Sequence, residues 1–142
     1  MKPACEEYNE QDDRQEHCWI IDIFPKRVSE EFNDCFSVVE SWFLKEPQRS
    51  DIILKKLHFL LKLNCYMRFQ GCTDMDGLSF ADPDPEHLLE LLTRHSLTIT
   101  AERLRIRSDK DETCMVLFTG DAEVPELIRT LCITEGWYLW PA

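Results

Sequence analysis

The order of strand-like and helix-like patterns along the chain constrains the fold more than any other feature of the sequence. Short runs rich in β-branched and aromatic residues are typical of buried strands. Apolar residues that recur every three or four positions indicate amphipathic helices instead. Together these patterns predict the order strand, two helices, strand, helix, two hairpin strands, helix, strand. We expect strands over 17–24, 65–70, 97–107, 113–119 and 137–140, and helices over 30–46, 51–64, 85–96 and 123–135.

This order predicts an α+β fold: a single domain in which helices pack on one face of a mainly antiparallel sheet of about five strands. The chain has 142 residues, which fits one domain. Residues 1–16 are acidic and poor in apolar side chains, so we expect an N-terminal arm there and the domain over 17–142. No apolar run approaches the ~20 residues of a membrane span, and the first residues do not resemble a signal peptide. We therefore expect a cytoplasmic protein.

Local signals mark several element ends. Asp84 followed by Pro85 is typical of a helix start, and Gly136 is typical of the residue just after a helix. The apolar phase of 97–107 changes near Ala101, which predicts a bulge or a bend there. In the helix over 51–64 we expect Lys56 on the solvent side. The helix that Ser29 caps is expected to bury one continuous apolar face, made of Phe32, Cys35, Phe36, Val39, Trp42 and Phe43.

Charge is the feature that bears most on function. The chain has 27 acidic and 16 basic residues, a formal net charge of −11, which repels nucleic acid and anionic membranes and favours basic partners. The acid is concentrated between residues 74 and 90, where no Lys or Arg occurs. We expect this segment to contact a basic protein. The alternative is that its carboxylates only shape turns, cap a helix and solvate an exposed face. The candidate partner-binding residues are Asp74, Asp76, Asp82, Asp84, Glu86 and Glu90.

The sequence carries no recognisable catalytic or metal-binding motif. The seven cysteines have wide, irregular spacings without a Cys-x-x-Cys pair, so we expect reduced, mostly buried thiols rather than a zinc site or a disulfide scaffold. The four histidines form no His-Glu-x-x-His motif, and Asp74-x-Asp76-Gly lacks the remaining ligands of a calcium loop. We therefore expect no enzymatic activity, no cofactor and no metal ion.

The C-terminal segment 120–142 resembles the ends of small, uncharacterised acidic proteins carried on mobile elements of Gram-positive gut bacteria. Those proteins share a helix opened by Pro or Glu, a Glu-Gly step and a final aromatic strand. The matching residues here are Glu126, Leu127, Leu131, Glu135, Gly136, Leu139 and Trp140. The resemblance implies no activity, but it implies a context, since small acidic proteins of phages and mobile elements often inhibit host-defence nucleases.

Three functional hypotheses follow. The first is a non-enzymatic, anti-CRISPR-like inhibitor that mimics nucleic acid and occupies the basic groove of a host-defence nuclease, without binding nucleic acid or membrane itself. The second is an immunity or antitoxin protein that neutralises a basic nuclease toxin. The third is a small RNA-binding module or enzyme that uses Arg103, Arg105 and Arg107, whose alternation would place them on one face of a strand.

Overall fold

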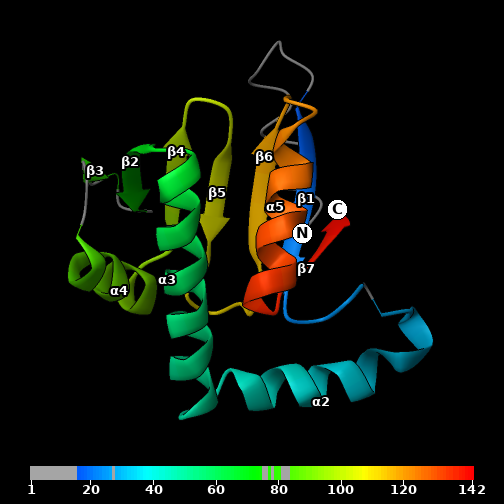
Figure 1. The fold of residues 1–142 in the computed structure, drawn as a ribbon. Helices are drawn as coiled ribbons and strands as arrows, with labels where there is room; N and C mark the ends of the chain where they lie inside the picture. The colour runs from blue at the N-terminus through cyan, green and yellow to red at the C-terminus, as the bar shows by residue number, and fades with distance from the viewer. Residues whose placement is uncertain (1–15, 27, 75–76, 78, 81–83) are drawn as a thin grey trace.

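A computed structural model describes residues 16–26, 28–74, 77, 79–80 and 84–142. Their secondary structure mixes strands and helices in an order close to the predicted one (Figure 1). The elements are β1 (His17–Asp22), the 3-10 helix η1 (Glu30–Phe32), α2 (Asn33–Phe43), α3 (Gln48–Tyr66), β2 (Phe69–Asp74), β3 (Ser79–Phe80), α4 (Pro85–Arg94), β4 (Leu97–Ala101), β5 (Arg105–Ser108), β6 (Met115–Thr119), α5 (Val124–Glu135) and β7 (Tyr138–Pro141).

One antiparallel sheet organises the described part of the chain. Its strand order is β3-β2-β4-β5-β6-β1-β7, and every neighbouring pair runs antiparallel. The α+β prediction is therefore confirmed, although the sheet has seven strands rather than about five. Two differences explain the count. The two-residue strand β3 was not predicted, and segment 97–107 forms two strands, because the chain turns back between Ala101 and Leu104.

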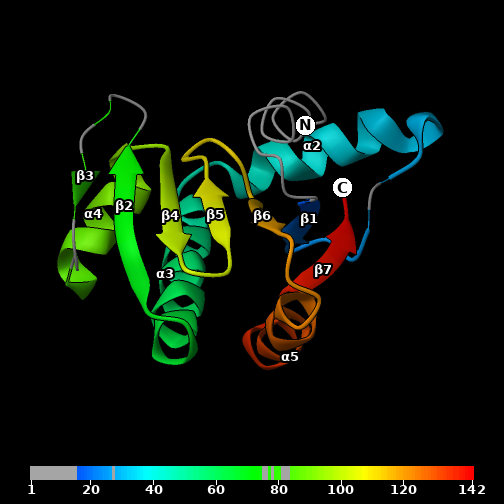
Figure 2. The ribbon, with the colours of Figure 1, turned by 90° about the horizontal axis from the view of Figure 1, so that it is seen from above.

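The main core lies between the sheet and the helices α3, α4 and α5. Seen from above, α3 and α5 lie on the same side of the sheet, whereas α2 lies toward the other side (Figure 2). Each of the three helices turns an apolar face inward, and the inner sheet face meets them. The deeply buried side chains of this core include Phe59, Leu60 and Leu63 of α3, Leu88 and Leu92 of α4, Val124 and Ile128 of α5, and Ile21, Ile99, Ile106, Met115 and Leu117 of the sheet.

Two of the helix boundaries predicted from local chemistry are confirmed, whereas Ser29 precedes η1 without a side-chain cap hydrogen bond and α2 begins only at Asn33. The Asp84 carboxylate caps α4 by accepting a hydrogen bond from the backbone N–H of His87 at 2.8 Å, and Pro85 occupies the first turn. Gly136 follows α5 with a positive φ of 77°, a conformation that favours glycine. The Lys55 ammonium then donates to the carbonyls of Glu135 (2.8 Å) and Gly136 (2.6 Å), which satisfies the end of α5.

The prediction that the first helix buries a continuous apolar face is wrong. The structure describes every residue of α2, and none of them is buried. Phe36 and Phe43 contact the Phe24 ring, at centroid distances of 4.9 Å and 5.9 Å, but Trp42 remains 51% exposed. The apolar periodicity correctly predicts an amphipathic helix. It does not say how much of that face the rest of the chain covers, and here Phe36 and Phe43 are partly covered whereas Phe32, Val39 and Trp42 are exposed.

Two further expectations need correction. Cys18 is disulfide-bonded, whereas the other described cysteines are free: Cys35, Cys65, Cys72, Cys114 and Cys132. The prediction of reduced thiols holds for those five, but the prediction that they are buried is wrong for Cys35 and Cys65, which are exposed. Lys56 does not face solvent. Lys56 is only 1% exposed, because its ammonium donates hydrogen bonds to Ser108, at the end of β5, and to Asp109 and Glu112 in the loop that follows.

Candidate protein-binding site

The structure divides the six predicted partner-binding residues into three groups. Asp76 and Asp82 lie outside the described residues. Asp74, the last residue of β2, has a side chain that is 0% exposed, with its Oδ2 atom 3.7 Å from Nδ1 of His95. Asp74 therefore cannot belong to an exposed acidic surface, because β2 directs this side chain toward His95. The remaining three residues, Asp84, Glu86 and Glu90, are exposed on α4.

The exposed carboxylates of α4 lie opposite its buried side. Glu86 and Glu90 are four positions apart, so they share one face of the helix. Leu88, Leu91 and Leu92 point the other way into the core. No described residue forms a hydrogen bond or an ion pair with the carboxylate of Glu86 or Glu90. This pair is therefore available to an external cation, whereas the Asp84 carboxylate already accepts a hydrogen bond as the helix cap.

The position of α4 is fixed by its neighbours. The Arg49 guanidinium, from the first turn of α3, donates to the carbonyl of Thr93 at 2.7 Å and so holds the C-terminal end of α4. At the other end, the His87 ring meets the ring of Phe80 edge-on, at a centroid distance of 4.8 Å. Because both ends are anchored, the face that carries Glu86 and Glu90 is presented by a helix with a defined orientation.

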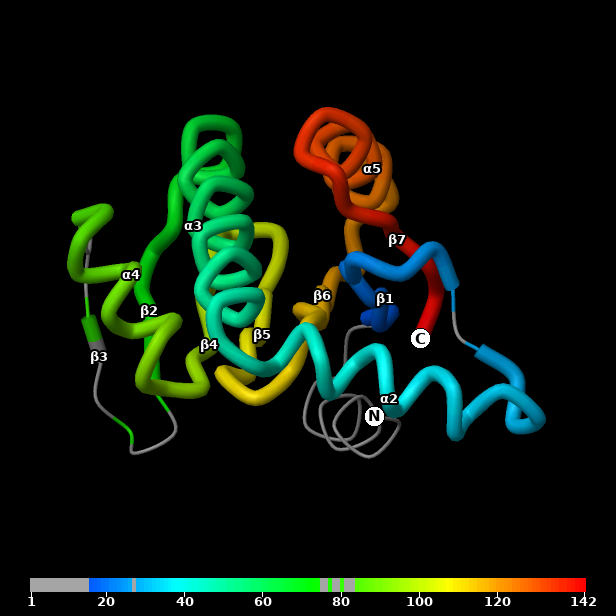
Figure 3. Tube along the Cα trace, turned by 90° about the horizontal axis from the view of Figure 1, so that it is seen from below, coloured from blue at the N-terminus to red at the C-terminus, as the bar shows by residue number. Residues whose placement is uncertain are grey.

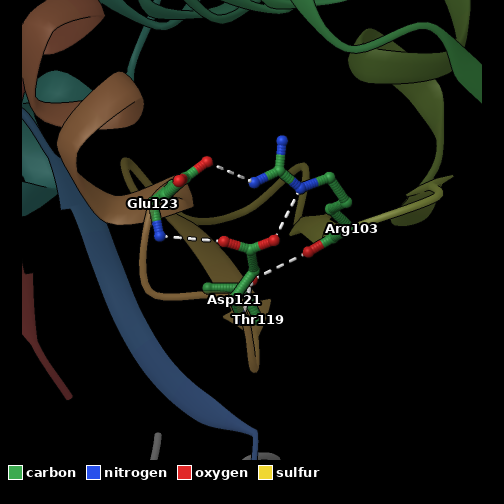
Figure 4. Close-up of polar contacts among 4 residues, drawn as sticks. All are labelled: Arg103, Thr119, Asp121 and Glu123. Carbon is green, nitrogen blue, oxygen red and sulfur yellow. Dashed lines mark hydrogen bonds and ion pairs between the residues drawn. The ribbon is translucent and has the colours of Figure 1, made fainter.

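Arg103 lies outside the strand that carries the other two arginines of the RNA-binding hypothesis, although Arg103 and Arg105 line one pocket. Arg103 lies in the turn before β5, where its Nε donates to Asp121 at 2.6 Å and its Nη2 to Glu123 at 3.0 Å (Figure 4). Hydrogen bonds to these two carboxylates raise the pKa of Arg103, and the contact with Arg103 lowers the pKa of Asp121. The guanidinium is thus engaged within the chain. Only Arg105 and Arg107 share a face of β5.

A buried polar cluster, which the sequence did not predict, lies where β1 and β5 end and the loop between β5 and β6 begins. The Lys56 ammonium donates to Ser108 Oγ (3.2 Å) and to the carbonyls of Asp109 (3.0 Å) and Glu112 (2.9 Å). Asp22 Oδ1 accepts from the backbone N–H of Ile23 (2.7 Å) and from the Thr113 hydroxyl (3.0 Å). Burial lowers the pKa of Lys56 to about 8 and raises the pKa of Asp22 to about 6. These hydrogen bonds attach the loop between β5 and β6 to α3 through Lys56 and to the end of β1 through Asp22.

The buried cysteines are poor nucleophile candidates. Burial raises the pKa of Cys72 to about 11 and of Cys132 to about 12, and it raises the pKa of Cys114 further still. Such thiols stay protonated at neutral pH, and the thiolate is the reactive form. Within the described part of the chain, no group of three or more His, Cys, Asp or Glu side chains could hold a metal ion. No helix among the described residues is both long and apolar enough to span a membrane.

No family model, curated protein or solved structure matches this chain. The site must therefore be interpreted from its own chemistry. In the described region, that chemistry is an exposed pair of carboxylates on a firmly held helix, within a strongly acidic chain.

Proposed function

We propose that this protein is a non-enzymatic inhibitor that works in the cytoplasm. The acidic face of α4 occupies the basic, nucleic-acid-binding groove of a host-defence nuclease. The observation that carries the proposal is the exposed pair Glu86 and Glu90, which no described residue neutralises. A groove that binds phosphates is lined with Lys and Arg, so a carboxylate pair on a rigid helix meets it with complementary charge.

The charge of the whole chain supports the same partner class. A formal net charge of −11 draws the protein toward a basic groove before contact is made, and it disfavours nucleic acid as the ligand. The engagement of Arg103 by Asp121 and Glu123 removes one of the cations on which an RNA-binding surface would depend. The resemblance of segment 120–142 to acidic proteins of mobile elements is consistent with an inhibitor of host defence.

A pull-down from lysate of a bacterial host, at about 50 mM and 500 mM salt, tests the proposal. Because exposed charge contacts are screened by salt, the inhibitor should enrich nucleic-acid-cleaving enzymes at low salt and release them at high salt. Each recovered nuclease is then assayed for cleavage with and without the purified protein. Recovery that ignores salt, or a recovered set without an inhibited nuclease, contradicts the proposal.

A further inference from the structure

A second exposed surface lies on η1 and α2, away from α4. Four large apolar side chains are exposed there: Phe32 (55%), Val38 (72%), Val39 (44%) and Trp42 (51%). At 100° per residue, Val38, Val39 and Trp42 fall within about 100° of the helix circumference. The inward side chains Phe36 and Phe43 lie on a different part of the circumference. The apolar arc of the helix is therefore wide, and the chain itself engages only the edge that carries Phe36 and Phe43.

The inner face of α2 is itself loosely packed. Its aromatic ring contacts with the body of the protein run through Phe24, and a cavity of about 200 Å³ remains between the helix and the sheet. Phe36 and Glu40 line this cavity from the helix side, and Ile20 and Trp140 line it from the sheet side. The helix thus extends along the lower end of the molecule rather than forming part of the core (Figures 1 and 3).

The charge around the exposed apolar stripe has one sign. Residues 28–44 contain Glu30, Glu31, Asp34 and Glu40 and no Lys or Arg. No described residue forms an ion pair with any of these carboxylates. Glu40 faces the inner cavity, which Lys26 also lines, so the carboxylates beside the exposed stripe are those of Glu30, Glu31 and Asp34. An apolar stripe flanked on η1 and α2 by three carboxylates is complementary to an apolar groove with basic edges.

We propose that η1 and α2 form a docking helix that inserts its exposed apolar stripe into a partner protein's apolar groove, rimmed by Lys and Arg. Helix-in-groove recognition uses anchors at this spacing, and a half-exposed tryptophan is a typical anchor. A second copy of this chain fits poorly, because its matching surface would bring three more carboxylates, Glu30, Glu31 and Asp34, against the first three. Residues 1–15 fit poorly for the same reason, since they carry five carboxylates against Lys2 and Arg14.

This docking helix is independent of the proposed role of α4. The two helices lie on either side of α3 in both views of the molecule (Figures 1 and 3). A groove-binding contact at α2 and a charge contact at α4 can therefore be removed separately. The docking helix can therefore be refuted while the role proposed for α4 still holds, and the reverse is also possible.

The probe for the test is a synthetic amphipathic helical peptide of Leu and Lys, added to the 15N-labelled full chain while amide chemical shifts are recorded. Two control peptides are used: one with the same composition in scrambled order, and one with Glu in place of Lys. The proposal expects shifts concentrated over residues 28–44 with the Leu/Lys helix, and weak binding of both controls. Shifts centred on α4 or spread over the whole surface overturn it.

Two variants separate the apolar and the charged parts of the docking helix. V38S/W42S should weaken binding of the Leu/Lys peptide by about tenfold or more, as expected for loss of a buried anchor. E31K/D34K should weaken it as well and should improve binding of the Leu/Glu peptide. The matched control is I133S, which alters a side chain that is 77% exposed on α5 and should bind as the wild type does. All of these residues are exposed, so circular dichroism should be unchanged.

Two results contradict the docking helix. If V38S/W42S binds the Leu/Lys peptide as tightly as I133S does, the apolar stripe is not the anchor. If sedimentation shows a dimer that V38S/W42S dissociates, the stripe belongs to an interface between two copies of the chain.

Discussion

Replacing Asp22 by Asn should stabilise the fold at neutral pH. Asp22 is only 6% exposed, and burial raises its pKa from 3.8 to about 6, against the opposing effect of hydrogen bonds from Ile23 and Thr113. The folded state therefore binds the Asp22 proton more tightly than the unfolded state does. Above pH 6 the charged carboxylate lowers the free energy of unfolding by its full amount. This loss becomes smaller as the pH falls from 6 to 4, and it disappears once the carboxyl group is protonated in both the folded and the unfolded state.

The size of the effect follows from the shift. A rise of about two pKa units corresponds to about 3 kcal/mol, at 1.36 kcal/mol per unit. Asn keeps the oxygen that accepts from Ile23 at 2.7 Å and from Thr113 at 3.0 Å, but it carries no charge. Its amide NH₂ group replaces the second carboxylate oxygen and accepts nothing, which offsets part of the gain. We expect D22N to gain about 1–3 kcal/mol at pH 7.5.

Urea unfolding at pH 7.5 and pH 4 measures the difference between D22N and the wild type. The control is D111N, which removes a charge from an exposed residue of the neighbouring loop and should change stability by less than about 0.5 kcal/mol. A gain at pH 7.5 that largely disappears at pH 4 supports the reasoning. Loss of stability in D22N at pH 7.5, or a gain of the same size at both pH values, refutes it.

Three other substitutions test parts of the fold. D84A removes the cap on the His87 N–H and should cost about 1 kcal/mol in urea unfolding. G136A should cost about 1 kcal/mol or more in the same assay, because its φ is +77° and a Cβ there would lie 2.5 Å from Nζ of Lys55. For Lys56, burial lowers the pKa to about 8, so only the unfolded state holds this proton between pH 8 and pH 10. The stability of the wild type relative to K56M should therefore rise across that range, as unfolding at each pH would measure.

The sequence predicted the parts of the fold that depend on local chemistry. Asp84 with Pro85 starts a helix, and Gly136 follows one, because capping and positive φ involve only neighbouring residues. The strand-like runs and their hairpins also gave the correct class. The change of apolar phase near Ala101 predicts a bulge or a bend, but it marks a tight turn between β4 and β5 rather than a bend within one strand.

Most of the wrong predictions concern burial that depends on contacts between one helix or strand and another part of the chain. The period of α2 predicts an apolar face, but only the tertiary arrangement decides that Trp42 is left exposed. Asp74 and Lys56 are buried, although charged residues in a turn and on a helix are usually solvated. Their burial depends on His95 in one case and on the carbonyls of a distant loop in the other. Of the candidate site, Glu86 and Glu90 lie as expected because helical spacing alone sets their common face.

If the Glu86 and Glu90 pair contacts a basic nuclease, reversing these two charges should weaken the contact more than reversing two exposed charges elsewhere. E86K/E90K and E102K/E126K change the net charge equally and alter only exposed residues, but only the first changes α4. The measurement is the rate at which each variant associates with a nuclease recovered in the pull-down, at about 50 mM salt. We expect E86K/E90K to associate at least about tenfold more slowly than E102K/E126K, with inhibition lost only in E86K/E90K. Equal rates for the two variants, or full inhibition by E86K/E90K, would contradict it.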